Sequence, residues 1–283
     1  MSLVVKSHCK VNLLLNVLGR RVDGFHEVET ILQPVPLFDE LHIDKTEDGF
    51  ELICSDARLS VGEENLVHRA ATAFLKKVES GGAKIHLQKS LPLAAGIGAG
   101  SSNAAWTLRG LNQLFENPLA ANQMQELAAG LGSDVPFFLQ DNLALATGRG
   151  EIIEPKKPFA ALNGKGLLLI HPGFGVSTPW AYQALAASGD YGNEGAAAAV
   201  LEALSAGRLD GLANSLEAPV FSKYTVLPVI KEFLADHGAL VALMSGSGST
   251  MFALTENRPA AETLRAQYHD HFGQAGWSAT VGL

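Results

Sequence analysis

The chain has few cysteines, no surplus of basic residues and no long apolar run. Its two cysteines, Cys9 and Cys54, have neither the spacing of metal ligands nor the number for a disulfide framework, which indicates a reducing compartment such as the cytoplasm. The formal net charge of −8 argues against nucleic-acid and membrane partners, which usually require a basic surface. The apolar run 11–18 is short and contains Asn12 and Asn16, so neither a secretory signal nor a membrane span is expected.

A sizeable core is available, because 47% of the 283 residues are hydrophobic. This length suits one large or two modest domains, and the segment from Pro155 to Pro158 marks a boundary that gives domains of 1–155 and 156–283. Strand-like and helix-like segments are mixed without a strict strand–helix–strand rhythm, and several neighbouring strands read as hairpins. We therefore expect an α+β fold.

The expected elements follow from apolar periodicity and turn residues. One hairpin is expected from 41–44 and 50–53 around Asp48 and Gly49, and a strand pair from 240–244 and 250–254. The Gly- and Ala-rich segment 188–199 is expected either to be mobile or to begin a helix late. The other expected strands are 4–17, 83–87, 166–171 and 278–281, and the expected helices are 65–78, 103–115, 123–131, 179–187 and 259–272.

The most informative segment is Pro92-Leu-Ala-Ala-Gly-Ile-Gly-Ala-Gly-Ser-Ser-Asn-Ala-Ala105, which joins the expected strand 83–87 to the helix 103–115. Glycines let the backbone approach an anion, and a helix N-terminus adds about half a positive charge. The segment is not a Walker A motif, because no lysine follows the last glycine. It is not a dinucleotide fingerprint either, because Ser101 replaces the third glycine. It therefore predicts a site for a phosphate chain; the alternative is a flexible surface turn.

Three further features point to chemistry. Lys10 and Asn12 share one face of the first strand, where a lysine can neutralise a phosphoryl group or lower the pKa of a hydroxyl; the alternative is an ordinary exposed lysine. Asp134 follows a helix end and precedes Pro136, which suits either a base that accepts a proton from an alcohol or a turn-forming aspartate. The segment Ser245-Gly-Ser-Gly-Ser249 between two apolar strands is either a hairpin loop or a second backbone cradle.

Together these motifs resemble the GHMP small-molecule kinases. In family order, 92–102 is similar to the phosphate-binding motif, 132–136 to the segment with the catalytic aspartate, and 244–249 to the C-terminal glycine motif. One branch of the family has patterns similar to Lys10-Val-Asn-Leu-Leu-Leu, Gly19-Arg-Arg-Val-Asp-Gly-Phe-His26, Glu64-Asn-Leu66 and His171-Pro-Gly173. The resemblance to this branch implies phosphorylation of the 2-hydroxyl, a tertiary alcohol, of a cytidine-diphosphate-linked methylerythritol in the non-mevalonate route to isoprenoids.

The resemblance implies a two-domain kinase fold, with an N-terminal domain over 1–155, a C-terminal domain over 156–283 and the active site in the cleft between them. It implies an ATP-dependent transferase that uses Mg²⁺. The metal would have no direct protein ligand and would be carried by ATP, with Ser101 or Ser102 nearby. Asp134 would accept the hydroxyl proton, and Lys10 would keep that aspartate ionised and the hydroxyl oriented. The oligomeric state is left open.

The resemblance also implies the binding residues. Asn12 would contact the polyol, His26 would hydrogen-bond the cytosine edge, and Phe25 would stack on the cytosine ring, with Tyr182 as the other stacking face. Gly246, Ser247 and Gly248 would complete the substrate-binding set. The residues expected to bind ATP are Asn65 and Leu66 near the adenine, and Pro92, Leu93, Ala94, Ala95, Gly96, Ile97, Gly98, Ala99, Gly100, Ser101 and Ser102 at the phosphates.

Two departures from the branch pattern stand out. Ala94, Ala95 and Ala99 occupy positions where glycines are common, and alanine adopts a positive φ only at a cost, so a stiffer loop is expected. Phe25 stands where a tyrosine is usual, which preserves stacking and removes a hydroxyl contact.

Two rival functions remain open. The first is another kinase of the same superfamily, acting on mevalonate, homoserine or a sugar. The second is a nucleotide-binding sensor without turnover, which would be expected to lack Lys10 or Asp134. A metal site at His269 and His271 is not expected, because positions two apart on a helix do not share a face.

Overall fold

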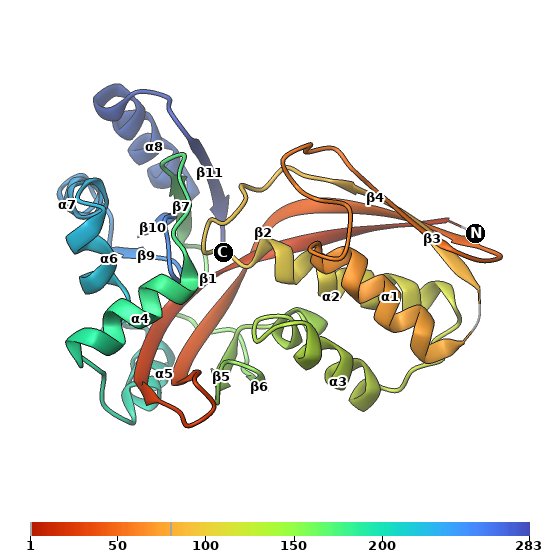
Figure 1. Ribbon diagram of the computed structural model, residues 1–283. Coiled ribbons are helices and arrows are strands. Elements are labelled where there is room, and N and C mark those ends of the chain that lie inside the picture. Colours follow the sequence, from red (N-terminus) through yellow and green to blue (C-terminus); the bar gives the residue numbers. More distant parts are fainter. Residues whose placement is uncertain (1, 80) are drawn as a thin grey trace. The chain divides into compact units, whose positions relative to one another are not determined.

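The computed structural model describes residues 2–79 and 81–283. Helices and strands are mixed along the chain, which confirms the α+β class (Figure 1). The chain forms two compact units, and β1 (Ser2–Arg20) and β2 (His26–Thr46) each contribute residues to both. The first unit contains the chain up to Cys9 with Pro36–Leu91 and Gly98–Asp141; the second contains Lys10–Val35, Pro92–Ile97 and Asn142–Leu283.

The sheet of the first unit has the strand order β3-β4-β2-β1, where β3 is Phe50–Cys54 and β4 is Gly82–Gln88. β4 runs antiparallel to β2, and β3 runs parallel to β4. The predicted hairpin of 41–44 with 50–53 is therefore wrong, because β4 lies between these two strands. Ile85 and Leu87 of β4 are fully buried, whereas Ile53 of β3 is 39% exposed, so the central position goes to the strand that buries more apolar surface.

The helices of the first unit are α1 (Leu66–Val78), α2 (Ala99–Leu114) and α3 (Ala121–Leu131), followed by the 3₁₀ turn η1 (Pro136–Leu139). α1 and α2 lie side by side (Figure 1). α2 packs closely on the strands, since a Cβ at Gly110 would overlap the Ile43 side chain. This close approach places the start of α2 at a defined position relative to the sheet.

The second unit contains a four-stranded antiparallel sheet. Its order is β11 (Trp277–Gly282), β7 (Gly166–His171), β10 (Met251–Thr255) and β9 (Val241–Met244). All six residues of β7 are buried, as expected for a continuous apolar run in a central strand. α7 (Val226–Asp236) and α8 (Arg258–Phe272) pack against this sheet, and the predicted strand pair β9–β10 is confirmed.

The remaining elements of the second unit are short. β5 pairs with β2 and with β6, and β8 runs parallel to β1. α5 begins near the end of the segment 188–199, which is the late helix start expected from the sequence. The bounds are β5 (Ala144–Thr147), β6 (Ile152–Pro155), β8 (Ala213–Asn214), α4 (Thr178–Ser188), α5 (Ala196–Ser205) and α6 (Glu217–Lys223).

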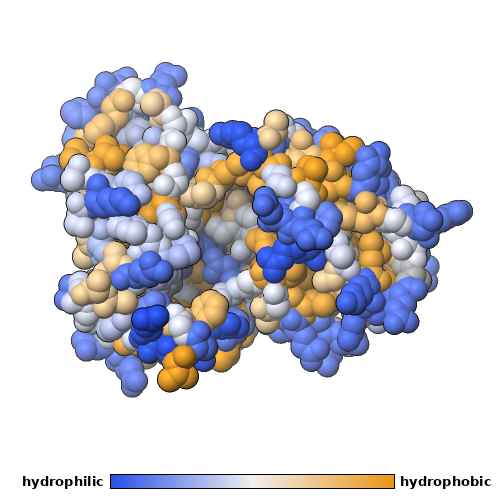
Figure 2. Space-filling view, viewed as in Figure 1, coloured by the Kyte–Doolittle hydropathy of each residue, from blue (hydrophilic) through white to orange (hydrophobic). Residues whose placement is uncertain are grey.

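Hydrophilic and hydrophobic residues are interspersed over the face shown in Figure 2. Folded proteins commonly expose much apolar surface, so this mixture does not by itself mark a docking site. Among the described residues, no helix has both the length and the apolar character needed to cross a membrane.

Candidate active site

The glycine loop, residues 92–102, is anchored to the fold by its backbone and by buried side chains. Ala95 and Ile97 are buried. The Ile97 carbonyl accepts a hydrogen bond from the Lys10 amide at 3.0 Å, and the Ala95 carbonyl accepts one from the Thr250 amide at 3.2 Å. The flexible surface turn considered for this segment is therefore excluded.

Three residues of the glycine loop adopt left-handed backbone conformations. Gly96 and Gly98 have φ values of 77° and 68°. A Cβ at Gly96 would also overlap the Ser245 carbonyl oxygen, so glycine is required there twice over. Ala94 has a φ of 51°, a conformation that costs an alanine about 1–2 kcal/mol. The loop therefore turns at Ala94 through a backbone conformation that is strained for alanine and would be unstrained for glycine.

The N-terminus of α2 offers unused polar groups. Gly98 is its N-cap and provides no side-chain hydrogen bond, and the first turn closes through the Ser102 amide and the Gly98 carbonyl at 2.9 Å. The preceding amides lack partners within the helix. The Ser102 hydroxyl is buried and has no hydrogen-bond partner in the described part of the chain. An orphaned hydroxyl beside free amides fits an anion or an anion-bound cation.

Lys10 is not the ordinary exposed lysine considered above, because only 3% of it is exposed. Its ammonium group donates to Asn12 Oδ1 at 2.6 Å and to the Gly96 carbonyl at 3.0 Å. Asn12 Nδ2 in turn donates to Thr30 Oγ1 at 2.8 Å, and the Thr30 hydroxyl donates to the Leu14 carbonyl. This chain of bonds fixes the orientation of the Asn12 amide and joins a buried cation to the glycine loop.

Asp134 lies in the first unit, in the turn between α3 and η1. Gly132 ends α3, and the Val135 amide donates to the Gly132 carbonyl at 3.1 Å, which closes the turn around Asp134. The Asp134 side chain is half-buried, while Phe137 and Phe138 immediately after it are fully buried and anchor the turn. The carboxylate is thus positioned by a short rigid connection, and its role as a base stays a prediction.

His26 and Tyr182 lie together in the second unit, with ring centroids 5.0 Å apart. The His26 Nε2 atom is buried and has no hydrogen-bond partner among the described residues. Burial, and secondarily the charge of Arg20, lowers the pKa of His26 from its usual value of 6.5. Phe25 is 50% exposed, and the Arg149 guanidinium lies over its ring, 4.7 Å from the ring centroid.

The segment 245–249 forms the hairpin loop considered for it, and its role as a second backbone cradle stays a prediction. It is the hairpin loop between β9 and β10, with the Ser245 amide bonded to the Thr250 carbonyl at 2.8 Å. It also lies against the glycine loop, because the Ser245 hydroxyl donates to the Gly96 carbonyl at 3.0 Å. Ser247 shares a hydrogen bond of 2.7 Å with the Thr178 hydroxyl at the start of α4. Gly246 and Gly248 have positive φ values.

Sequence reasoning missed Asn214, which supports this hairpin loop from β8. Its amide donates to the carbonyls of Met244 at 2.7 Å and Gly246 at 2.8 Å, and its Oδ1 accepts from the Leu216 amide. No local pattern around Asn214 could have revealed this, since its partners lie about thirty residues further along the chain. Only the parallel pairing of β8 with β1 brings Asn214 to its position.

Asn65 is the N-cap of α1, and both the oxygen and the nitrogen of its side-chain amide form hydrogen bonds within the first unit. Oδ1 accepts from the Val67 amide at 2.9 Å and Nδ2 donates to the Ser60 carbonyl at 2.7 Å. A Cβ at Gly100 would touch the Leu66 side chain, so the start of α1 lies beside the start of α2. Contact of Asn65 and Leu66 with adenine stays a prediction.

His269 and His271 each contact neighbouring side chains of the second unit. His269 Nε2 shares a hydrogen bond with the Ser278 hydroxyl at 2.8 Å, and His271 lies against the Phe233 ring. Within residues 2–79 and 81–283, no group of three or more histidine, cysteine or acidic side chains could hold a metal ion.

The chain matches two family models, the GHMP kinases N-terminal domain over residues 65–142 and the GHMP kinases C-terminal domain over residues 158–274. Together they cover more than half of the chain. The first match contains Asp134 and the whole glycine loop, and the second contains the β9–β10 hairpin.

Curated relatives match over nearly the whole chain. A protein of Synechococcus sp. (strain JA-3-3Ab) named 4-diphosphocytidyl-2-C-methyl-D-erythritol kinase is 39% identical over 97% of this chain and 92% of its own length. A protein of the same name from Pelobacter propionicus (strain DSM 2379 / NBRC 103807 / OttBd1) is 38% identical over 99% of this chain and 98% of its own length.

Solved structures match as well. A crystal structure of 4-(cytidine 5'-diphospho)-2C-methyl-D-erythritol kinase has a TM-score of 0.81 at 35% identity and covers 99% of this chain and 100% of the other. A homoserine kinase from Cytophaga hutchinsonii ATCC 33406 has a TM-score of 0.70 at 20% identity, covering 99% of this chain and 93% of its own, which shows a shared fold alone.

Proposed function

The chain belongs to the GHMP kinase family, and from this we propose that it transfers a phosphoryl group from ATP to the 2-hydroxyl of 4-(cytidine 5'-diphospho)-2-C-methyl-D-erythritol, in the non-mevalonate route to isoprenoids. One observation carries the choice of acceptor. Relatives named for that acceptor are 38–39% identical over almost the full chain, whereas the homoserine kinase is 20% identical. The chain is thus a small-molecule kinase that acts on an alcohol.

The glycine loop and the N-terminus of α2 would bind the phosphates of ATP. No side-chain cap competes with an anion for the backbone amides there, and Gly96 allows close approach. We propose Mg²⁺ as the second cofactor, with Ser101 or Ser102 near it, because the buried Ser102 hydroxyl has no partner among the described residues. When bound with ATP, Mg²⁺ supplies positive charge that offsets the charge on the phosphates.

Lys10 and Asp134 would perform the transfer. The hydroxyl oxygen of the acceptor forms a bond to the γ-phosphorus, the bond from that phosphorus to the bridging oxygen of ADP breaks, and Asp134 accepts the hydroxyl proton. Lys10 places a fixed positive charge at the glycine loop, where its bonds to Asn12 and Gly96 hold it. The charge would stabilise the transferring group and orient the hydroxyl.

The cytidine end of the acceptor would lie at His26, with Phe25 and Tyr182 as stacking surfaces. A lowered pKa keeps the His26 imidazole neutral at pH 7, so the ring has one donor and one acceptor nitrogen. The cytosine edge also presents donors and acceptors, which makes the buried, unpartnered Nε2 a suitable contact. Asn12 would contact the polyol, and Gly246, Ser247 and Gly248 would close the substrate site through their backbone.

The division of the chain into domains 1–155 and 156–283 also stays a proposal. Its support is that the two family models match segments on either side of that position, 65–142 and 158–274. A cytoplasmic location is proposed as well, because the two cysteines, Cys9 and Cys54, are not joined in a disulfide.

The test is ADP release by the purified chain with MgATP and four acceptors: the cytidine-diphosphate methylerythritol, mevalonate, homoserine and galactose. We expect turnover with the cytidine compound alone. Turnover with another acceptor would retain the phosphate site and overturn the assignment of Phe25 and His26. Absence of turnover with every acceptor, with ATP still binding, would favour the sensor.

A further inference from the structure

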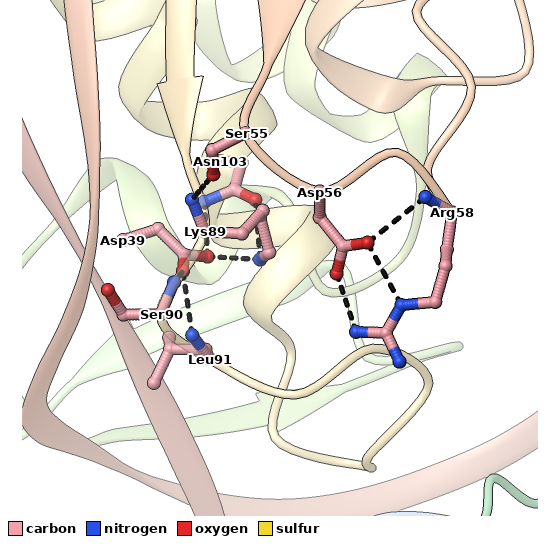
Figure 3. A network of polar contacts seen from close by, with 8 residues as sticks. All are labelled: Asp39, Ser55, Asp56, Arg58, Lys89, Ser90, Leu91 and Asn103. Carbon is pink, nitrogen blue, oxygen red and sulfur yellow. Dashed lines mark hydrogen bonds and ion pairs between the residues drawn. The ribbon is translucent and has the colours of Figure 1, made fainter.

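A buried carboxylate in the first unit joins the two ends of the glycine loop. Asp39 lies on β2 and is fully buried. Its Oδ1 accepts hydrogen bonds from the backbone amides of Ser90 at 2.8 Å and Leu91 at 2.9 Å. Its Oδ2 accepts from Asn103 Nδ2 at 3.0 Å and forms an ion pair with the Lys89 ammonium (Figure 3).

The hydrogen-bond partners of Asp39 flank the glycine loop in the sequence. Ser90 and Leu91 are the last residues before the glycine loop, and β4 has already ended at Gln88, so no strand pairs with their amides there. Asn103 is the first residue after the loop and lies within α2. One carboxylate therefore binds the backbone on one side of the loop and the helix on the other.

The buried polar groups around Asp39 pair with one another. The Lys89 side chain is only 3% exposed, and its ammonium also donates to Asn103 Oδ1 at 3.2 Å. Asn103 Nδ2 donates to the Ser7 hydroxyl on β1 as well as to Asp39. Burying an aspartate and a lysine is expensive unless all their polar atoms are paired, so each member depends on the others. Such a network favours a single arrangement of the loop ends.

The neighbouring Asp56–Arg58 pair in Figure 3 makes a useful contrast. Asp56 accepts from the Arg58 guanidinium at 2.6 and 2.9 Å and from its backbone amide, all within one exposed turn. These bonds lower the pKa of Asp56 to about 2. They make no link to the glycine loop.

We propose that Asp39 is a positioning residue for nucleotide binding. By fixing Ser90, Leu91 and Asn103 to one carboxylate, it holds the glycine loop in its binding conformation before the nucleotide arrives, so that ordering the loop costs little on binding. The inference rests on the proposed phosphate-binding function of that loop. It adds Asp39, Lys89 and Asn103 as residues that act on ATP affinity without touching ATP.

The test is Asp39→Asn, with Asp56→Asn as the matched control. The asparagine keeps the size of the side chain but presents an amide hydrogen to the Lys89 ammonium or to the Ser90 and Leu91 amides, which breaks one half of the network. Titration calorimetry with MgATP alone should give a Kd about tenfold or more higher for Asp39→Asn. Asp56→Asn should match the wild-type protein.

The steady-state constants separate positioning from folding. A partly unfolded variant loses active molecules, which lowers apparent kcat and leaves both KM values unchanged. Positioning instead raises the KM for MgATP and leaves the KM for the alcohol acceptor within about twofold. Asn103→Ala removes the bonds of α2 to Asp39, Lys89 and Ser7 and leaves the bonds of Asp39 to the Ser90 and Leu91 amides in place. It should raise the Kd for MgATP by about threefold or more, and it tests the inference if Asp39→Asn does not fold.

Two results would overturn the inference. Wild-type MgATP affinity in both Asp39→Asn and Asn103→Ala would overturn it alone and leave the kinase function intact. Failure of the wild-type protein itself to bind MgATP would overturn the phosphate-loop assignment and the inference with it.

Discussion

Lys10 and Asp134 are held by different kinds of local structure. Lys10 is buried on β1 and its ammonium is bonded to Asn12 and to the Gly96 carbonyl of the glycine loop, so its position is fixed by strand and loop together. Asp134 sits in a turn between Gly132, which ends α3, and the buried Phe137. A stabilising charge and a catalytic base both need a fixed position, and each of these two settings provides one.

Asp134→Asn removes the proposed base while keeping the size of the side chain. We expect turnover to fall by about 10²–10⁴-fold, because the amide cannot accept the hydroxyl proton, while the Kd for MgATP stays nearly unchanged. The measurement is ADP release at saturating substrates together with calorimetry.

The control for that variant is Asp141→Asn. Asp141 is an exposed aspartate that forms an ion pair with Arg109 at 2.7 Å. Loss of this ion pair should leave turnover unchanged. Equal activity of Asp134→Asn and the wild-type protein would contradict the assignment of the base.

At the scale of elements, the β9–β10 hairpin depends on a side chain from elsewhere in the chain. Asn214 on β8 donates to two carbonyls of the hairpin loop, and the Glu217 carboxylate on α6 accepts from the Met244 amide at 2.8 Å. The hairpin loop in turn donates from Ser245 to Gly96 of the glycine loop. A change at Asn214 should therefore spread from the hairpin to the glycine loop.

Asn214→Ala leaves two buried carbonyls and the Leu216 amide without their partner. We expect the free energy of unfolding to fall by about 2–3 kcal/mol, measured by urea denaturation. Asn257→Ala is the control, since it removes only the N-cap of α8 and should cost about 1 kcal/mol. An equal or smaller effect at Asn214 would contradict its supporting role.

The sequence predicted the elements whose signal is local and failed where strand pairing depends on a segment far away in the chain. β7 was predicted because four apolar residues, 167–170, follow one another, and α8 was predicted from Pro259, one residue after its actual start. The hairpin at 41–53 was wrong because β4, some thirty residues later, pairs with both strands. α7 was missed although its buried Leu227, Ile230 and Leu234 have helical spacing, and the short β8 carries no local signal.

The candidate site divides in the same way. The glycine loop stands out locally through its glycines and serines, whereas Lys10 and Asp134 received their roles through the resemblance of their segments to the family motifs. Asp39 and Asn214 do not stand out locally, because they act on backbone amides and carbonyls of distant segments. A stiffer loop was expected because a positive φ is costly for alanine; Ala94 nevertheless adopts φ 51°, which no local rule indicates.

For the molecule as a whole, buried histidines make the free energy of unfolding depend on pH. Burial lowers the pKa of His8 and of His171 below 6.5; at His8 the charge of Asp141 opposes this and that of Arg109 adds to it. The His8 ring packs against Trp106 and Phe138, and its Nε2 has no partner within the described residues. The unfolded chain therefore binds more protons than the folded one below pH 6.5.

Stability should consequently be complete above about pH 6.5 and decline as the pH falls through the lower pKa values of the folded state. Urea denaturation at pH 7.5 and at pH 5 should show a lower free energy of unfolding at pH 5. His8→Phe, which keeps a ring against Trp106 and Phe138, should reduce that difference. A stability that stays level or rises toward pH 5 would contradict this account.

The central claim is that the whole chain moves a phosphoryl group from ATP to an alcohol of a cytidine-linked acceptor. Phosphorus NMR of the purified chain with MgATP and 4-(cytidine 5'-diphospho)-2-C-methyl-D-erythritol tests it most directly, because each phosphorus atom is followed. The account predicts ADP, a new phosphomonoester on the acceptor and an intact acceptor diphosphate. Unchanged ATP, or ADP with inorganic phosphate as the only new product, would contradict it.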